Sequence, residues 1–73
     1  MTAYFILNED GDRLRDKDGY NYIPFSEITP WNFTDYAYKS RQAAEGEVQH
    51  FDPEGRAGLQ VAERQINFEI NNT

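Results

Sequence analysis

The fold is decided by the stretch Ala3-Tyr4-Phe5-Ile6-Leu7-Asn8-Glu9-Asp10-Gly11, in which an apolar run leads directly into a turn. Residues 4–7 include the aromatic and β-branched types that favour strands. Residues 8–11 predict a tight turn, because glycine adopts the positive φ that such turns need. A second turn at residues 16–19 and a strand at residues 20–23, ended by Pro24, follow. We therefore predict a β-meander over residues 3–23.

The next segment predicts one main helix over about residues 30–45. Ser26 and Thr29 are candidate N-caps, and Pro30 suits the first turn after Thr29. Residues 34–45 contain good helix formers without a breaker, and Gly46 is the expected end. Helical spacing places Tyr38 on the outer side. The expected inner face consists of Phe33, Tyr36, Ala37, Ser40 and Ala44.

The C-terminal part predicts further strands over residues 47–70. Residues 47–51 suit a strand, and residues 52–55 a turn with Pro and Gly in place. Apolar residues fall on odd positions over 59–61 and on even positions over 66–70, so the strand changes face. A turn at residues 62–64 or a bulge within 62–65 explains that change. The expected fold is a single α+β domain over residues 1–73, with an antiparallel sheet of about four or five short strands packed against one main helix.

Charge and composition narrow the function. Thirteen acidic and seven basic side chains in 73 residues give a formal net charge of −6. That balance argues against direct binding of nucleic acid or of an anionic membrane, since each requires a basic face. The absence of cysteine suits a reducing compartment, and the apolar run at residues 1–7 is too short for a signal peptide or a membrane span. We expect a cytoplasmic protein.

No catalytic, metal or cofactor site is predicted. The acidic stretch starting at Asn8 superficially resembles a calcium loop, but Arg13 occupies the position that requires glycine, and in the frame starting at Asp16 that position is Asn21. His50, the one histidine, is expected to be a half-exposed strand residue. No nucleophile motif or glycine-rich phosphate loop accompanies it. A small hydrolase that uses carboxylates such as Glu45 and Glu47 ranks last among the functions.

Aromatic side chains are concentrated between Tyr20 and Tyr38, which span seven of the eleven in the chain. We expect four of them to build the core, namely Phe25, Trp31, Phe33 and Tyr36. The others are expected at the surface beside the acidic turns, because Tyr anchors protein contacts and carboxylates complement a basic partner. The predicted partner-binding residues are Glu9, Asp10, Asp12, Asp16, Asp18, Tyr20, Tyr22 and Tyr38.

These features predict a small, acidic, non-catalytic protein-binding module that acts as an inhibitor by covering a basic surface of its target. Carboxylates can stand in for phosphates and rings for bases, so the partner surface is one that normally holds nucleic acid. In size, acidity and lack of catalytic residues the chain is similar in kind to the small proteins with which phages disable bacterial defence systems, anti-CRISPR proteins among them. The alternative is a structural or assembly subunit that self-associates, as a homodimer for instance, through an aromatic face.

Overall fold

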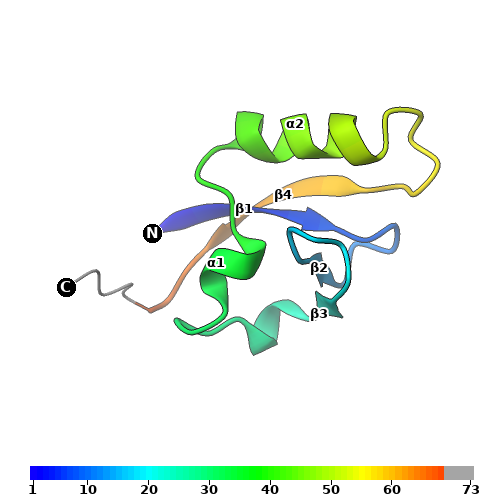
Figure 1. The fold of residues 1–73 in the computed structure, drawn as a ribbon. Coiled ribbons are helices and arrows are strands. Elements are labelled where there is room, and N and C mark those ends of the chain that lie inside the picture. The colour runs from blue at the N-terminus through cyan, green and yellow to red at the C-terminus, as the bar shows by residue number, and fades with distance from the viewer. Residues whose placement is uncertain (69–73) are drawn as a thin grey trace.

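The computed structural model describes residues 1–68 and shows a small α+β domain (Figure 1). A four-stranded antiparallel sheet has the strand order β3-β2-β1-β4. Its elements are β1 (Thr2–Leu7), β2 (Leu14–Arg15), β3 (Tyr22–Ile23), the 3-10 helix η1 (Phe25–Glu27), α1 (Phe33–Tyr36), α2 (Arg41–Phe51) and β4 (Gln60–Gln65). The predicted fold class, an antiparallel sheet with one main helix, is confirmed.

The first three strands form an antiparallel meander. Leu14 pairs with Leu7 of β1 on one side and with Ile23 of β3 on the other. Gly11 and Gly19 adopt φ values of 75° and 80° in the two connecting turns. Positive φ strains residues that carry a Cβ atom, so these glycines allow both turns to close.

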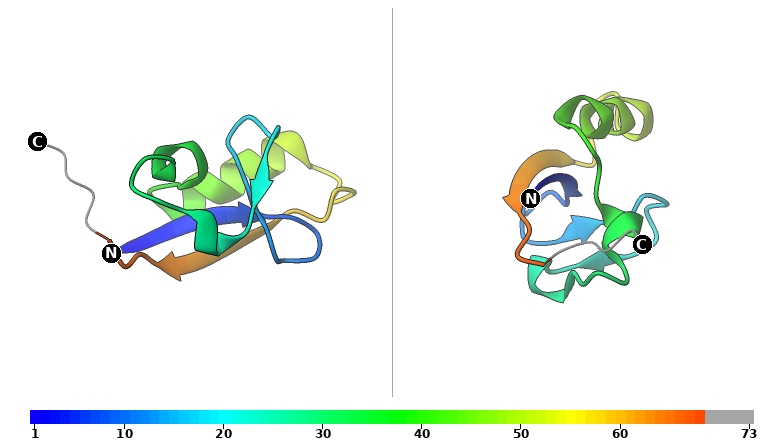
Figure 2. Two further views of the ribbon diagram at one scale, coloured as in Figure 1. Left: turned by 90° about the horizontal axis from the view of Figure 1, so that it is seen from below. Right: turned by 90° about the vertical axis from the view of Figure 1, so that its left-hand side faces the viewer.

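The central strand β1 is covered on both faces. Ala3, Phe5 and Leu7 pack into one apolar cluster, which also contains Tyr36 of α1 and Ile28, the residue after η1. Phe25 of η1 meets the ring of Phe5 edge-on from the same side. Tyr4 and Ile6 belong to a second cluster beneath α2. The sheet therefore lies between α2 on one side and the η1–α1 segment on the other, as Figures 1 and 2 show. Burial on both faces explains why the β1 sequence is continuously apolar instead of alternating.

The predicted bounds of the main helix, about residues 30–45, are wrong. Helix α1 ends at Tyr36, and the chain is extended before α2 begins at Arg41. The interruption occurs because Tyr38 pairs with Tyr4 through two backbone hydrogen bonds, of 2.7 and 3.2 Å. The short strand β2 leaves Tyr4 unpaired on that side of β1. Ser40 then caps α2, since its Oγ accepts a hydrogen bond from the Ala43 N–H at 3.1 Å.

Residues 47–51, predicted as a strand, instead complete α2. Gly46 lies inside this helix and does not end it. Alanine-rich helix formers before it and packing of Ala44 and Val48 beneath the helix outweigh the cost of one glycine, which is about 1 kcal/mol. The longest helix of residues 1–68 has eleven residues, and no helix there combines the length and apolar character needed to cross a membrane.

The expected turn or bulge near residues 62–65 is absent from β4. The strand pairs with β1 without interruption, from Gln60 opposite Leu7 to Gln65 opposite Thr2. Apolar side chains occur at both odd and even positions because each face of the sheet is covered by its own apolar cluster. Val61 packs towards α2, whereas Ala62 packs into the opposite cluster. The prediction for residues 69–70 lies outside the described residues.

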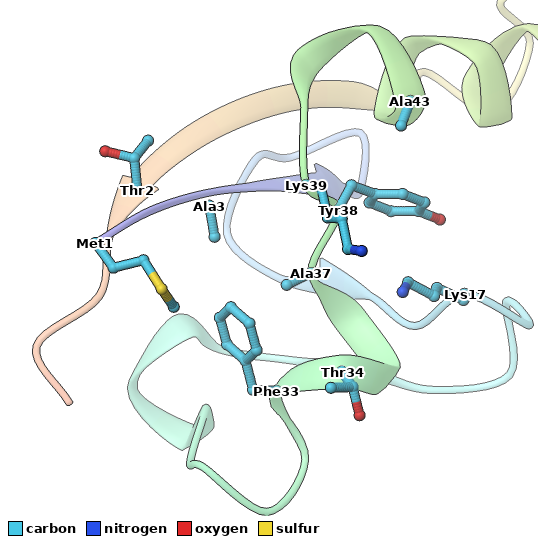
Figure 3. Close-up of a pocket in the computed structure, with 10 residues that line it drawn as sticks. All are labelled: Met1, Thr2, Ala3, Lys17, Phe33, Thr34, Ala37, Tyr38, Lys39 and Ala43. Atoms are coloured by element: carbon cyan, nitrogen blue, oxygen red, sulfur yellow. The ribbon is translucent and has the colours of Figure 1, made fainter. Parts of the chain in front are cut away.

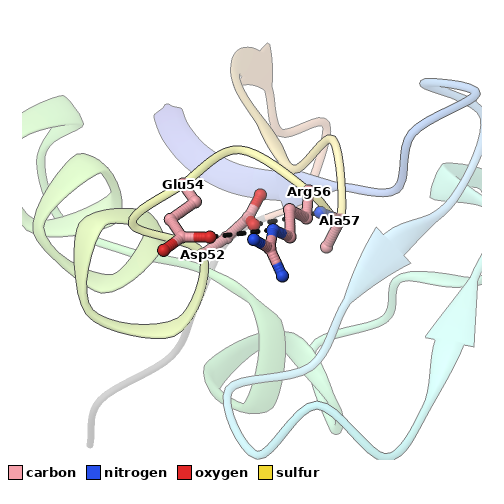
Figure 4. A network of polar contacts seen from close by, with 4 residues as sticks. All are labelled: Asp52, Glu54, Arg56 and Ala57. Atoms are coloured by element: carbon pink, nitrogen blue, oxygen red, sulfur yellow. Dashed lines mark hydrogen bonds and ion pairs between the residues drawn. The ribbon is translucent and has the colours of Figure 1, made fainter.

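The loop between α2 and β4 is closed by Asp52. Its carboxylate accepts hydrogen bonds from the backbone N–H groups of Ala57 at 3.0 Å and Leu59 at 3.4 Å. The bond from Ala57 is the main cause that lowers the pKa of Asp52 below its ordinary value, against the opposing effect of burial. Glu54 and Arg56 form an ion pair of 2.8 Å at the outside of the loop (Figure 4). The buried carboxylate, and not the exposed ion pair, therefore fixes the loop.

Candidate functional site

Asn8 organises the first acidic turn, residues 8–13. Its side-chain Oδ1 accepts hydrogen bonds from the backbone N–H groups of Asp12 at 3.0 Å and Arg13 at 3.1 Å. The backbone N–H of Asn8 donates to Arg13 at 3.0 Å, and Gly11 donates to the Asn8 carbonyl at 3.0 Å. The acidic side chains of this turn are all exposed: Glu9, Asp10 and Asp12.

The second turn, residues 16–21, repeats this pattern eight positions later with Asp16 in place of Asn8. The Asp16 carboxylate accepts from the backbone N–H groups of Tyr20 at 2.9 Å and Asn21 at 3.2 Å. The Asp16 N–H donates to Asn21 at 2.9 Å, and Gly19 donates to the Asp16 carbonyl at 3.1 Å. The shared sequence pattern is Asn or Asp, any residue, then Asp-Gly. This repeat was missed in the sequence, although both copies are visible there.

Asp16 is therefore a structural residue, and the prediction that it contacts a partner places it wrongly at the surface. Its side chain is buried, and the side-chain amide of Asn21 donates a further hydrogen bond of 3.0 Å to it. Burial alone would raise the pKa of Asp16. The hydrogen bonds from Asn21, Tyr20 and Gly19 outweigh burial and lower the pKa below its ordinary value.

The two turns lie at opposite ends of β2 (Figure 1). This strand has two residues, so the turns are separated by about 7 Å of strand rise. Asp18 and Tyr20 belong to the second turn and are exposed, and Tyr20 is 85% exposed. Tyr22 lies on β3 opposite Arg15 and is 39% exposed. The structure thus brings seven of the predicted residues to the two ends of one short strand pair, six of them at the surface.

Tyr38, the eighth predicted residue, is buried, so its expected place in a surface patch is wrong. Its pairing with Tyr4 turns the side chain under α2, where it packs with Ile6 and Ala44. Among residues 1–68 the hydroxyl group finds no hydrogen-bond partner. Burial, followed by the negative charge of Glu47, raises the pKa of Tyr38 above its ordinary value.

Trp31, predicted as a core residue, is instead the most exposed of the large apolar side chains, at 89%. The loop that carries it is closed by side chains. Thr29 Oγ1 accepts from the Trp31 N–H at 3.2 Å, and Asn32 Oδ1 accepts from the Thr29 N–H at 2.8 Å. Asn32 also donates from its amide to the Glu27 carbonyl at 3.0 Å. This rigid loop places Trp31 outward, and the signal for it is the sequence Thr29-Pro30-Trp31-Asn32.

The other predicted core aromatics do contribute to the core. Phe25 is 37% exposed, but its ring meets that of Phe5 edge-on at 5.9 Å between centroids. Phe33 meets Phe5 in the same manner at 6.3 Å, and Tyr36 is buried. These contacts fill the side of the sheet opposite α2.

A polar hollow of about 430 Å³ lies between the second turn and α1. The backbone N–H of Lys17 donates to the Asp35 carbonyl at 2.8 Å and joins the two segments. Burial is the largest cause that raises the pKa of Tyr36, and the negative charges of Asp16 and Asp35 add to it. The hollow therefore has a negative potential and is suited to a cationic group. Its lining is Asp16, Lys17, Asp18, Asn21, Thr34, Asp35 and Tyr36.

The cations of the chain are placed differently from its carboxylates. Arg15 lies 4.8 Å from the ring centroid of Phe51, Lys17 lies 5.2 Å from that of Tyr38, and Arg41 lies 5.5 Å from that of Tyr4. Within residues 1–68 the one ion pair is that of Glu54 with Arg56. Three of the seven cations thus lie against aromatic rings, and the acidic side chains of the turns stay without a cationic partner in the described part of the chain.

An apolar hollow of about 500 Å³ lies on the other side of Tyr38 (Figure 3). Met1, Ala3 and Phe33 line it, and the ammonium groups of Lys17 and Lys39 point towards it in the close-up. Such a surface can hold an apolar group, but it contains no candidate nucleophile paired with a base.

No group in residues 1–68 has the arrangement of a metal site, since no three His, Cys, Asp or Glu residues cluster suitably there. His50 lies on α2 and not on a strand as predicted, and its ring meets that of Phe51 at 4.7 Å. Aromatic packing at the surface accounts for its position.

Comparison with known proteins reveals no relative of this chain. The chain matches no family model, no curated protein and no solved structure. Its function is therefore argued from its own residues.

Proposed function

We propose that this chain is a non-catalytic protein-binding module that covers a basic surface of its partner. One observation carries the proposal: in residues 1–68 the exposed carboxylates of the turns have no cationic partner, whereas three of the seven cations lie against aromatic rings. We define the acidic surface as Glu9, Asp10, Asp12 and Asp18, all of them exposed. A partner with basic side chains would supply the positive charges that these carboxylates do not find within the chain.

In such a contact, electrostatic attraction raises the association rate and orients the two proteins more than it raises their affinity. Exposed ion pairs contribute about 0.2–1 kcal/mol each, and they weaken as salt rises. The opposite charges would steer the two proteins together and select against acidic competitors. Further affinity has to come from side chains that lose water on contact.

Tyr20 and Trp31 are suited to provide that affinity. Both are large, amphipathic and more than four-fifths exposed, at 85% and 89%. Each extends from a turn that hydrogen bonds hold in one conformation, so binding costs little ordering entropy. Aromatic side chains on rigid supports are the usual anchors of protein interfaces. The proposed contact therefore contains Tyr20, Tyr22 and Trp31 beside the acidic surface. Asp16 and Tyr38 are buried and lie outside it.

A surface that normally holds nucleic acid fits this arrangement. Carboxylates replace phosphates, and rings offer the faces on which an arginine side chain or a base-binding residue stacks. The polar hollow beside Asp35 would receive one cationic side chain of the partner. A small inhibitor that occupies a nucleic-acid channel would have these properties. A cytoplasmic location suits the proposal, since the chain has no cysteine for disulfides.

The test compares two variants that remove the same charge. One carries Asp10→Asn, Asp12→Asn and Asp18→Asn, and the control carries Glu45→Gln, Glu47→Gln and Glu63→Gln on α2 and β4. Each tagged protein is used to capture partners from nuclease-treated host lysate, and the bound material is challenged with a nucleic-acid oligonucleotide. We expect the wild type and the control to retain one partner that the oligonucleotide releases. The proposal fails if the first variant still captures the partner, or if the oligonucleotide does not release the partner from the wild type.

A further inference from the structure

Strand β4 is an open edge of the sheet. The strand order places it at one end, and in the described residues 1–68 Figure 2 shows β1 along one side of it and no further strand along the other. In β1 the backbone groups of Tyr4 are paired on the β2 side, where they meet Tyr38. The direction of the backbone groups alternates along a strand, so those of Phe5 point towards β4. The backbone groups of Ala62, the partner of Phe5, therefore point towards β1. It follows that the N–H and C=O groups of Val61, Glu63 and Gln65 point away from the sheet.

The opposite edge is protected in ways that β4 is not. Strand β3 has two residues, and Pro24, which cannot donate a hydrogen bond, follows it directly. Strand β4 has six residues, an unbroken register and neither proline nor glycine. Natural sheets usually shorten, bulge or block their edges because an open edge pairs with another strand. We infer that β4 is a strand-pairing surface.

We propose that its occupant is β4 of a second copy, paired antiparallel about a two-fold axis. Outward-pointing residues can only pair with outward-pointing residues, so the axis passes through a residue position and not between two. Centring on Glu63 or on Arg64 places two like charges directly opposite each other, which is unfavourable. Centring on Ala62 or on Val61 avoids both clashes. An axis at Ala62 pairs residues 60–64 of the two strands, whereas an axis at Val61 pairs only residues 60–62, so the longer pairing favours Ala62.

In that register the strand complements itself. Ala62 lies opposite Ala62 of the second copy, where its small side chain permits close approach. Gln60 faces Arg64 of the second copy, and Val61 exchanges backbone hydrogen bonds with Glu63 of the second copy. The two α2 helices then lie on the same face of one continuous sheet, formed from two sheets of four strands each.

This inference goes beyond the proposed function and does not depend on it. Asp18 lies in the turn between β2 and β3, which the strand order separates from β4, whereas the first turn meets the start of β4, where Gln60 Nε2 donates a hydrogen bond of 2.9 Å to the Glu9 carbonyl. A dimer through β4 leaves Asp18 accessible on both copies and presents two such carboxylates at once. Two linked contacts raise the apparent affinity for a partner with repeated basic sites.

The first test is the mass of the protein in solution by sedimentation equilibrium, from about 10 µM to about 1 mM, a range that detects weak dimers. We expect the mass to rise towards that of a dimer. Glu63→Pro removes an N–H group that points away from β1, so it should stay folded and remain monomeric. The matched control Glu63→Gln retains the N–H and should dimerise. A wild type that is monomeric throughout, or a dimeric Glu63→Pro variant, overturns the proposal.

The second test reports the register and does not depend on the proline variant. The chain has no cysteine, so Ala62→Cys introduces a single thiol. The proposed axis brings the two Cα atoms to about 4.5 Å, within the range of a disulfide. We expect rapid oxidation to a covalent dimer, whereas Gln65→Cys, displaced from the axis, should cross-link at least tenfold more slowly. Equal rates for the two variants would rule out the register centred on Ala62.

Discussion

The two acidic turns have the same hydrogen-bonding scheme but use their acids differently. In residues 8–13 a neutral side chain, Asn8, closes the turn, and the acidic residues are all exposed, although the Asp12 carboxylate accepts a hydrogen bond of 2.8 Å from the Asn8 amide. In residues 16–21 the carboxylate of Asp16 closes the turn from inside. The position in the turn, and not the presence of an acid, therefore decides whether a carboxylate holds the fold or stays exposed.

The largest effect is expected when the closing side chain of each turn is removed. Asp16→Ala leaves the part-buried N–H groups of Tyr20 and Asn21 without this charged acceptor and should lower the free energy of unfolding by roughly 3 kcal/mol. Asn8→Ala removes a neutral acceptor at an exposed turn and should cost about 1 kcal/mol. Chemical denaturation measures both. If the two variants lose equal stability, the distinction between the turns is unfounded. Asp16→Asn should recover part of the loss, because Asn performs the same role in the first turn.

A smaller difference is expected between the two turn glycines. Both have positive φ, so alanine strains each by about 1–2 kcal/mol. At Gly19 a Cβ atom would also lie 2.5 Å from Nη2 of the buried Arg15, whereas at Gly11 the nearest atom, Nε2 of Gln60, is 3.8 Å away. Gly19→Ala should therefore unfold at lower denaturant than Gly11→Ala. The reverse order would contradict the packing of Arg15 against the second turn.

The pH dependence of stability should also separate the turns. The folded state lowers the pKa of Asp16 below its ordinary value of 3.8, so this carboxylate stabilises the protein above about pH 4. That contribution is lost as the pH falls through the lowered pKa. Thermal melting between pH 2 and pH 7 should show this loss in the wild type and a smaller one in Asp16→Asn. An unchanged acid transition in the variant would count against the role of Asp16.

The smallest effect is expected at Tyr38, which lies behind the second turn beneath Lys17. Its buried hydroxyl has no hydrogen-bond partner in the described part of the chain, so Tyr38→Phe should leave stability unchanged or increase it by up to about 1 kcal/mol. Partner capture should not change, because the ring lies inside the fold. A marked loss of stability would show that the hydroxyl makes a contact that the structure lacks.

Local signals determined which elements could be predicted. The meander follows from glycines and apolar runs that act within a few residues of each other. The helix bounds could not be predicted, because the break after Tyr36 comes from pairing of Tyr38 with Tyr4, far away in sequence. The uninterrupted strand through Val61 and Ala62 could not be predicted either, because local sequence does not show that both faces of the sheet are covered.

The candidate site was predicted in part for the same reason. The exposed acids of the first turn, together with Asp18 and Tyr20, follow from turn residues alone. Asp16 could have been recognised as structural by comparing its turn with that of Asn8. Trp31 was assigned to the core on its apolar character, whereas the side chains of Thr29 and Asn32 close a loop that holds it outside.

The most direct test measures binding and stability together on two variants. One is the triple variant Asp10→Asn, Asp12→Asn, Asp18→Asn, and the other is Asp16→Asn, each titrated against the captured partner and melted in parallel. We expect the triple variant to keep the wild-type melting temperature and to bind at least tenfold more weakly. We expect Asp16→Asn to melt lower but, while folded, to bind like the wild type. A triple variant that binds normally would contradict the assignment of the outer carboxylates to a partner.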